Sequence, residues 1–227
     1  MFKKKKIIAI IPARGGSRRI KDKNIVSFNG RPMLKKTLDV VKKCKYIDKI
    51  IVSTDSKKIL RIAKKEGIHT PFLRPTAYDY KASIHEATLV AIDQSEKYFG
   101  KFDIVVQLMP NCPLRKLKTL NLSIENFFKK KKNSQISFFE FGFANPRWAH
   151  KIKNSKVIPL NKKNLFKRSQ DMDKLYCPTG SIWISEIQTL KKYRTFYSPS
   201  YGYFIMNFEE AIDIDTHDDL KIAKKFI

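Results

Sequence analysis

Residues 7–24 read IIAIIPARGGSRRIKDKN, and they decide the class of fold expected for this chain. The apolar run Ile7–Ile11 is typical of a strand that is buried on both faces of a parallel sheet. It ends at Pro12 and leads into a loop that holds five basic residues together with Gly15 and Gly16. Glycine permits positive φ and close approach of main-chain N–H groups to a ligand. Because α/β proteins bind anions where a buried strand opens into such a loop, the stretch predicts an anion site on an α/β fold.

The loop does not belong to the common phosphate-binding patterns. It matches neither GxxxxGK[ST] nor GxGxxG, which disfavours the P-loop and dinucleotide-binding classes. A plainer interpretation stays open, in which this is an ordinary turn between a strand and a helix that is basic because the whole chain is basic.

The order of strand, loop and helix recurs from residue 7 to residue 131. Further strands are expected at residues 47–53 and 102–108, and helices are expected at residues 31–45, 57–66, 83–98 and 117–131. Polar residues gather on the loops that follow the strands. The pattern predicts a doubly wound α/β domain with a mostly parallel sheet and a ligand crevice at the carboxyl ends of its strands.

The composition changes from Gln135 onward, where aromatic residues become frequent. The segment from about residue 138 to 205 is interpreted as short strands and loops, and it is too aromatic for a disordered linker. Two interpretations remain open for it. It is either an extension of the sheet with an aromatic core or a subunit interface, where aromatic residues are enriched.

Acidic residues gather near the C-terminus, in the run Ala211-Ile212-Asp213-Ile214-Asp215. In an extended strand, Asp213 and Asp215 share one face while the two isoleucines face the core. Paired carboxylates favour a hard divalent cation such as Mg²⁺, which also binds substrate phosphates. The alternative is that they pair with some of the many lysines. Asp218 and Asp219 are expected to cap a final helix over residues 218–227.

The net charge of +26 raises the question of nucleic-acid binding. The lysines are spread over nearly every segment, and no helix-turn-helix, zinc-finger or RNA-recognition motif accompanies them. A nucleic-acid-binding module is therefore the lower-ranked alternative, and no nucleic-acid partner is expected.

The cysteines and the N-terminus bear on the compartment. Three cysteines far apart in the chain argue against a disulfide framework, and Ile7–Ile11 is too short for a signal peptide or a membrane span. We expect a soluble, cytoplasmic protein without a membrane partner.

The basic loop and the aspartate pair together suggest nucleotidyl transfer. Arg14, Lys23 and the main-chain amides of residues 15–17 stabilise a triphosphate, and Asp213 and Asp215 hold the metal. No Ser-His-Asp or Cys-His arrangement is legible. A guanylyl- or uridylyltransferase that acts on a sugar phosphate is the alternative within the same class of enzyme.

Several motifs together resemble one family. In order they are IPARGGS at residues 11–17 with Lys23-Asn24, Ser53-Thr54-Asp55-Ser56, Arg74-Pro75, Pro113-Leu114-Arg115 and Ile212-Asp213-Ile214-Asp215. This order resembles the acylneuraminate cytidylyltransferases, the CMP-sialic acid synthetase family. The resemblance implies a Rossmann-like nucleotidyltransferase fold with an inserted dimerisation sub-domain at about residues 138–205, and a homodimer. It also implies transfer of CMP from CTP to the anomeric hydroxyl of a sialic-acid-like nonulosonic acid.

The resemblance also assigns roles to individual residues. Metal binding falls to Asp213 and Asp215, with Mg²⁺ as the cofactor. The residues expected to bind CTP are Arg14, Gly15, Gly16, Ser17, Lys23, Asn24, Arg74 and Ser83. The residues expected to bind the sugar are Gln107, Met109, Arg168, Gln170 and Thr179.

The chain departs from the family pattern mainly at sugar-facing positions. Met109 stands where the family often has Gln, with Gln107 two residues earlier, and Asn111-Cys112 replaces a Thr-Ser pair. Thr179 replaces an Asn. The run Arg168-Ser169-Gln170-Asp171 approximates an Arg-Gln-Asp run whose Arg can reach the sugar carboxylate bound to the partner subunit. The identity of the sugar is therefore left open.

Overall fold

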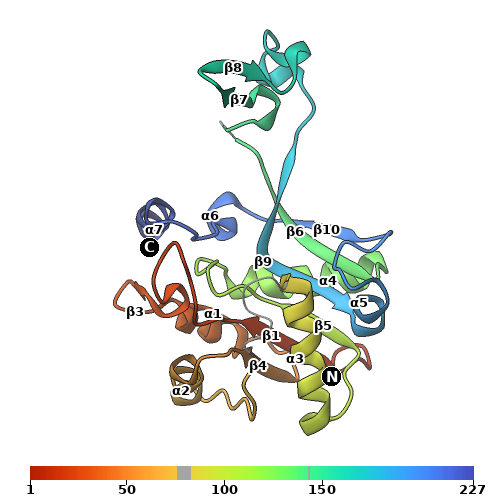
Figure 1. Ribbon diagram of the computed structural model, residues 1–227. Coiled ribbons are helices and arrows are strands. Elements are labelled where there is room, and N and C mark those ends of the chain that lie inside the picture. Colours follow the sequence, from red (N-terminus) through yellow and green to blue (C-terminus); the bar gives the residue numbers. More distant parts are fainter. Residues whose placement is uncertain (76–82, 143) are drawn as a thin grey trace.

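A six-stranded sheet forms the centre of the protein, with strands in the order β10-β6-β9-β5-β1-β4 (Figure 1). The computed structural model describes residues 1–75, 83–142 and 144–227. The strands are β1 (Ile7–Pro12), β4 (Lys49–Ser53), β5 (Ile104–Gln107), β6 (Ser134–Glu140), β9 (Tyr176–Glu186) and β10 (Gly202–Ile205). Neighbouring strands are parallel except where β9 pairs with β5 and β6. The prediction of a mostly parallel α/β sheet is confirmed.

Helices cover both faces of this sheet. Because side chains alternate along a strand, β1 buries Ile7 and Ile11 on one face and Ile8 and Ile10 on the other. The first face packs against α1 (Met33–Val41), α2 (Lys57–Lys65) and α4 (Leu117–Lys130). The second packs against α3 (Ile84–Phe99) and α5 (Ile187–Tyr193). Burial of every residue of β1 explains why its sequence is continuously apolar.

The helix ends follow local capping chemistry. Ser56 accepts a hydrogen bond from Ile59 N and begins α2, and Gly67 has φ of 82° just beyond its end. Ser83 forms a capping box with Glu86 at the start of α3. Within the described ranges, no helix is long and apolar enough to cross a membrane.

A third apolar cluster joins the two ends of the chain. It contains Ile20 from the loop after β1, Ile212 and Ile214 from the acidic run, and Leu220 from α7 (His217–Ala223). Packing between these residues holds the basic loop against the acidic run, although almost two hundred positions separate them. Two short elements also belong to this side: the hairpin of β2 (Ser27–Phe28) with β3 (Arg31–Pro32), and α6 (Phe208–Ala211).

The strand expected around Asp213 and Asp215 is wrong. Residues 212–215 form a loop between α6 and α7, and Ile214 N donates to Asn111 O at 2.8 Å, so the loop after β5 takes the place of a neighbouring strand. The alternation is nevertheless correct, since Ile212 and Ile214 are 8% and 0% exposed. The expected cap of the last helix is also present, because Thr216 and Asp219 form a capping box at the start of α7.

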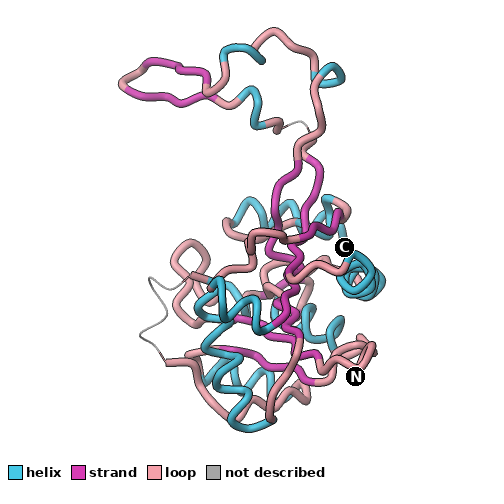
Figure 2. Tube along the Cα trace, turned by 90° about the vertical axis from the view of Figure 1, so that its right-hand side faces the viewer, coloured by secondary structure: helices cyan, strands magenta, loops and turns pink. Residues whose placement is uncertain are grey.

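Beyond the sheet, β6 and β9 continue into an arm, defined here as residues 141–175 (Figures 1 and 2). The arm carries a ribbon of β7 (His150–Lys153) and β8 (Lys156–Pro159), followed by short 3-10 turns. The sub-domain expected at residues 138–205 is therefore too wide. Its later part, with β9, α5 and β10, belongs to the sheet and its helical cover, because residues such as Trp183 and Phe196 pack into the core.

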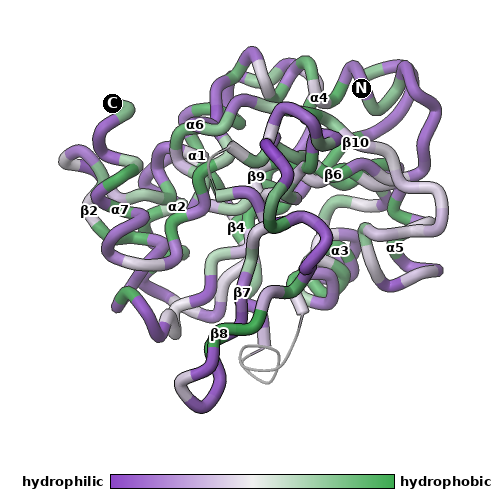
Figure 3. The backbone as a smooth tube through the Cα atoms, turned by 90° about the horizontal axis from the view of Figure 1, so that it is seen from above, coloured by the Kyte–Doolittle hydropathy of each residue, from purple (hydrophilic) through white to green (hydrophobic). Residues whose placement is uncertain are grey.

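The arm leaves apolar side chains exposed. Ile152 is 78% and Phe166 is 96% exposed, and Val157, Ile158 and Leu160 are exposed as well. In Figure 3 apolar positions follow one another along this part of the chain, next to β8. The arm packs little of its apolar surface against the rest of its own chain.

Candidate active site

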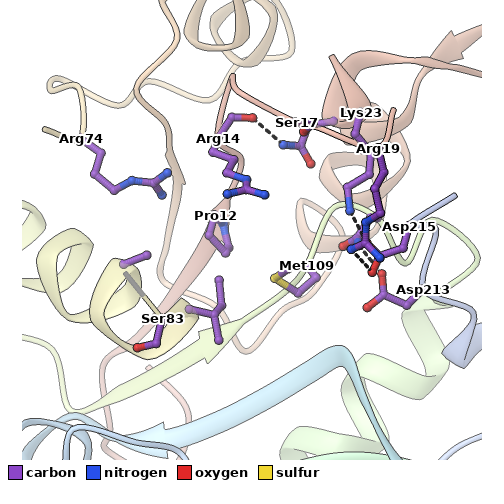
Figure 4. A pocket seen from close by; sticks show the side chains of 14 residues that line it. Pro12, Arg14, Ser17, Arg19, Lys23, Arg74, Ser83, Met109, Asp213 and Asp215 are labelled. Atoms are coloured by element: carbon purple, nitrogen blue, oxygen red, sulfur yellow. Dashed lines mark hydrogen bonds and ion pairs between the residues drawn. The ribbon is translucent and has the colours of Figure 1, made fainter. Parts of the chain in front are cut away.

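A pocket of about 300 Å³ lies where β1 and β5 end (Figure 4). Most of the residues expected to bind nucleotide and metal line it, and the chain brings them together from four separate segments. The lining residues are Pro12, Arg14, Ser17, Arg19, Lys23, Asn24, Arg74, Ser83, Ile84, Ala87, Met109, Asn111, Asp213 and Asp215.

Positive charge prevails in this pocket. Four cationic side chains and two carboxylates line it, which leaves two positive charges in excess. In Figure 4 the carboxylates of Asp213 and Asp215 lie with Lys23 and Arg19, and Arg74 and Ser83 lie at the opposite side. The pocket thus suits an elongated anion that meets cations along its length and a metal ion at one end.

Hydrogen bonds to β4 and to the residues that follow β4 hold the loop after β1 in place. Ala13 N donates to Ser53 O at 2.8 Å, and Gly15 N donates to the Asp55 carboxylate at 2.7 Å. Asn24 is buried and its amide donates to Arg14 O at 2.8 Å, which closes the loop on itself. These bonds place Arg14 at the rim of the pocket.

The two glycines do not act as expected. The glycines with positive φ are Gly30, Gly67 and Gly100. Glycine at position 15 suits close packing, because a Cβ there would lie 3.0 Å from Ser56 Cβ. Gly15 N is bonded to Asp55, and Ser17 N donates to Gly15 O at 3.1 Å, so these two amides are engaged within the protein. Neither Gly15 nor Gly16 lines the pocket.

Asp215 carries two ion pairs. Lys23 Nζ lies 2.6 Å from Oδ1, and Arg19 Nη2 lies 2.5 Å from Oδ2. Partial burial raises the pKa of Asp215, but the hydrogen bonds and charges of Lys23 and Arg19 outweigh burial and hold that pKa below its usual range. Asp215 is therefore a firmly ionised carboxylate.

Asp213 has a different environment. It accepts a hydrogen bond from the Asn111 amide, and burial, followed by the charge of Asp215, raises its pKa to about 6. Gly180 on β9 permits this close arrangement, since a Cβ there would lie 2.9 Å from Met109 Cγ and 3.5 Å from Asp213 Oδ2. The two aspartates thus differ in burial, partner and pKa although two positions separate them.

The donor set suits Mg²⁺. Within the described ranges no three His, Cys, Asp or Glu side chains come together as a metal cage, so the protein supplies a carboxylate pair. One or two carboxylates plus substrate phosphates are the usual ligands of Mg²⁺ in phosphoryl-transfer sites. Asn111 Oδ1 is also buried and has no hydrogen-bond partner within the described part of the chain, so another hard oxygen lies in this corner.

Of the five residues expected to bind the sugar, Met109 lines the pocket, and Gln107 and Thr179 lie outside it, in strands of the sheet. Gln107 is fully buried in β5, and its Oε1 accepts from Thr88 Oγ1 on α3 at 2.6 Å. Thr179 is buried on β9 and its hydroxyl donates to Ala211 O at 2.8 Å. Thr179 lines a neighbouring cavity of about 300 Å³ that has Asp213 as a common wall.

The other two lie on the arm. Arg168 and Gln170 are exposed, the first beside and the second within the turn Ser169–Asp171, and Arg168 Nε lies 2.7 Å from the Asp171 carboxylate. Neither contributes to the pocket of its own chain. Their expected action on a partner subunit stays a prediction.

Three residues were given no role by the sequence. In the sequence, Arg19 is one of many basic residues, Asn111 is a departure from the family pattern, and Arg115 belongs to the motif Pro113-Leu114-Arg115. Its guanidinium is buried and donates to Ser181 Oγ at 3.1 Å, Thr37 Oγ1 at 3.4 Å and Met109 O at 2.9 Å, and burial lowers its pKa to about 10. It fixes the loop that carries Met109 and Asn111.

Known proteins share this chain's fold. The structure of CMP:2-keto-3-deoxy-manno-octonic acid synthetase in complex with CTP aligns with a TM-score of 0.74 at 15% identity, over 97% of this chain and 98% of the other. The 4-diphosphocytidyl-2C-methyl-D-erythritol synthase of Anaerococcus prevotii aligns with a TM-score of 0.65 at 18% identity, over 98% of this chain and 96% of the other. At these identities the alignments show the fold alone.

Sequence relatives span almost the whole chain. The pseudaminic acid cytidylyltransferase of Campylobacter jejuni subsp. jejuni serotype O:23/36 is 30% identical over 96% of this chain and 95% of its own length. The CMP-N,N'-diacetyllegionaminic acid synthase of Legionella pneumophila is 31% identical over 98% of this chain and 96% of its own length. Residues 8–226 also match the profile of the family described as Cytidylyltransferase. This chain is a member of the cytidylyltransferase family.

Proposed function

We propose that this protein transfers CMP from CTP to the anomeric hydroxyl of a nonulosonic acid and releases pyrophosphate. The observation that carries the proposal is the pocket in which Arg14 and Lys23 from one end of the chain lie with Asp213 and Asp215 from the other. The relatives named for pseudaminic, legionaminic and N-acylneuraminic acids support a nonulosonic acid as the acceptor.

The cationic side chains bind and orient the triphosphate. Arg14 reaches the pocket from the rim of the loop, and Lys23, whose side chain is 17% exposed, lies deeper beside the aspartates. Fixed cations in a partly buried pocket stabilise negative charge that develops on the departing pyrophosphate. Arg74 is 4% exposed and its guanidinium donates to Ser53 O at 3.3 Å, so it is positioned in advance at the far side.

Asp213 and Asp215 are the residues that hold Mg²⁺ in this proposal. The chemistry that Mg²⁺ would supply there is positive charge that offsets the negative charge of the phosphates during transfer. A triphosphate carries more negative charge than the two positive charges in excess in the pocket, so a divalent cation completes the charge balance. Asn111 keeps Asp213 in place through its amide.

The proposal includes a homodimer. The exposed apolar residues of the arm, such as Ile152 and Phe166, are covered by a second copy of the chain. In that arrangement Arg168 acts on the acidic sugar bound by the partner.

The test is a transfer assay with defined substrates. Purified protein is incubated with CTP, Mg²⁺ and, in turn, pseudaminic acid, N,N'-diacetyllegionaminic acid, N-acetylneuraminic acid and 2-keto-3-deoxy-manno-octonic acid. Pyrophosphate and the CMP-sugar are measured together. If pyrophosphate is released with none of the first three acids, which are nonulosonic acids, the proposed substrate class is contradicted.

Two further versions of the same assay separate the alternatives. GTP and UTP replace CTP, with sugar phosphates as acceptors, to test for a guanylyl- or uridylyltransferase. Thermal stabilisation by CTP but not by GTP or UTP supports the cytidylyl assignment, since only a ligand that binds the folded protein raises its apparent stability.

A further inference from the structure

A second cavity lies at the edge of the sheet where β4 is the last strand. Its volume of about 520 Å³ exceeds that of the active-site pocket and is typical of ligand sites. The helices α2 and α3 cover opposite faces of the sheet (Figure 1), and residues of both line the cavity together with the start of β4 and the segment after α2. No described residue lines both this cavity and the active-site pocket.

The cavity lies at the other end of β4 from the active-site pocket. Lys49, which lines the cavity, is the first residue of β4 and pairs with Ile8 near the start of β1. The active-site pocket lies where β1 ends. Because β1 and β4 are parallel, the length of β4 separates the two places. A ligand in this cavity therefore does not occupy the place of a substrate of the transfer reaction.

The cavity is positively charged. Lys49 and Lys64 line it, and no Asp or Glu is among the described residues that do so. Within the described ranges neither lysine takes part in an ion pair. Lys49 Nζ lies 3.7 Å from the centre of the Phe99 ring, a contact that holds the ammonium group at the wall of the cavity. Two lysines without acidic partners at a partly enclosed cavity attract an anion.

Aromatic and polar contacts hold the walls of the cavity in place. Tyr98 is 57% exposed, and its ring stacks against Phe72 with the two centroids 5.8 Å apart. Thr70 is buried, and its hydroxyl accepts a hydrogen bond from Val52 N at 3.1 Å, which ties the segment after α2 to β4. The cavity thus has a fixed, exposed aromatic ring in addition to its two cations.

We propose that this cavity is a second ligand site, which binds a nucleoside monophosphate. The base stacks on the ring of Tyr98, and the phosphate is bound by Lys49 and Lys64. Stacking on an aromatic side chain suits any base because every base has a π-face, and lysine binds phosphate as a point charge. The observation that carries the inference is the presence of two lysines without ion pairs and an exposed, held ring around one cavity.

Equilibrium dialysis of the full chain against radiolabelled AMP tests the proposal. CTP and Mg²⁺ are present at saturating concentration to occupy the active-site pocket. One AMP is expected to bind to each chain, with a Kd in the sub-millimolar range. Adenosine lacks the phosphate and ribose 5-phosphate lacks the base, so each should bind at least about tenfold more weakly than AMP. Absence of saturable AMP binding overturns the proposal, and so does equal affinity for AMP and either fragment.

Two substitutions test whether the bound AMP lies in this cavity. Lys64→Glu reverses the charge at an exposed position of α2 and should weaken AMP binding about tenfold or more, the loss typical of a hydrogen bond to a charged group. Tyr98→Ala removes the stacking surface and should weaken AMP binding about fivefold or more. The unfolding temperature of each variant shows that it is folded. Wild-type affinity for AMP in either folded variant overturns the proposal.

Each substitution has a matched control. Lys65→Glu makes the same charge reversal at the next exposed position of α2, which does not line the cavity. Tyr193→Ala removes a ring that is 41% exposed on α5, also outside the cavity. Both controls should bind AMP as the wild type does. An equal loss in a variant and in its control contradicts the assignment of AMP to this cavity.

The outcome is distinguishable from that of the proposed function. Neither Lys64 nor Tyr98 lines the active-site pocket, so Lys64→Glu and Tyr98→Ala should release pyrophosphate at the wild-type rate. If AMP binds as expected while no sugar acid supports pyrophosphate release, the inference stands and the proposed function fails. If pyrophosphate is released but AMP does not bind, the inference fails and the proposed function stands.

Discussion

The apolar side chains beside the pocket are buried, whereas those on the arm are exposed. Beside the pocket, Ile20 and Ile214 are 2% and 0% exposed, and they hold the charged loops at fixed positions. On the arm, Ile152 and Phe166 are 78% and 96% exposed. Contacts within one chain therefore set the geometry of the pocket, whereas these apolar side chains of the arm stay exposed in a single chain.

The two regions should therefore respond differently to substitution. Changes at the pocket act on chemistry and folding within each chain, and changes on the arm act on association. The predictions below test this division.

The largest effect is expected at the aspartate pair. Asp213→Asn and Asp215→Asn should each lower turnover by at least about 10³-fold, which corresponds to about 4 kcal/mol of lost transition-state stabilisation. The measurement is pyrophosphate release with saturating CTP and the best sugar acid, together with the unfolding temperature of each variant.

The matched control is Asp218→Asn. Its carboxylate is 83% exposed, pairs with Lys221 and lies outside the pocket. This variant should keep its activity. Turnover near the wild-type value in either pocket variant would remove the metal role from that aspartate.

The next effect is expected in the cluster that joins the chain ends. Ile214→Ala should lower the free energy of unfolding by about 2–4 kcal/mol, because it leaves a cavity among fully buried neighbours. Ile222→Ala, on the half-exposed face of α7, should cost less than about 1 kcal/mol. Urea unfolding of both variants measures the difference.

Activity should follow the same order. Loss of Ile214 loosens the contact between the basic loop and the acidic run, so folded Ile214→Ala should also turn over more slowly than folded Ile222→Ala. Equal stability of the two variants would mean that the third cluster does not hold the two loops together.

A smaller effect on activity is expected from the arm. Phe166→Asp should convert the proposed dimer into monomers at micromolar concentration, because a charge would replace an apolar contact with the second copy. CTP binding should persist, and the KM for the sugar acid should rise about tenfold, the effect of about 1.4 kcal/mol. Analytical ultracentrifugation and initial rates are the two measurements.

Leu122→Asp is the control for a charge introduced on an exposed apolar position. Leu122 is 46% exposed on α4, away from the arm. This variant should remain a dimer. A wild type that sediments as a monomer at all concentrations would contradict the role given to the arm.

The sequence predicts features that depend on neighbouring residues better than it predicts contacts between distant segments. The run Ile7–Ile11 predicted its strand because burial on both faces requires unbroken apolar residues. Most residues expected to bind nucleotide and metal line one pocket, and the place of the loop after β1 follows from the rule that loops after parallel strands meet at one edge; the roles of these residues stay predictions. Only contacts between distant segments could show that Asp215 pairs with Arg19.

The errors have a common physical origin. Gln107 is only two residues from Met109, but the strand ends between them, so the alternation of faces could not be carried across. Aromatic content could not distinguish the residues of the arm from those of the sheet. The segment around Trp183 and Phe196 is also rich in aromatic residues, but these two residues pack in the core.

The smallest predicted effect concerns His85 on α3, which contacts two aromatic residues that pack in the core, Trp183 and Phe196. Its ring stacks on Trp183 at 5.4 Å between centroids, and its Nδ1 accepts a hydrogen bond from Phe196 N at 3.3 Å. Burial lowers the pKa of His85, and the charge of Glu86 opposes this only in part. Protonation in the folded state would remove the acceptor.

The sign of the pH effect follows from this lowered pKa. Below about pH 6.5 the unfolded chain protonates this histidine before the folded protein does, so acid favours unfolding. Wild-type stability should therefore fall more steeply between pH 6.5 and 5 than that of His85→Phe, by at most about 1.4 kcal/mol for each pH unit. His69→Phe, which replaces an exposed histidine, is the matched control in urea unfolding at each pH. Parallel curves for the wild type and His85→Phe would show that His85 is not held neutral by the aromatic core.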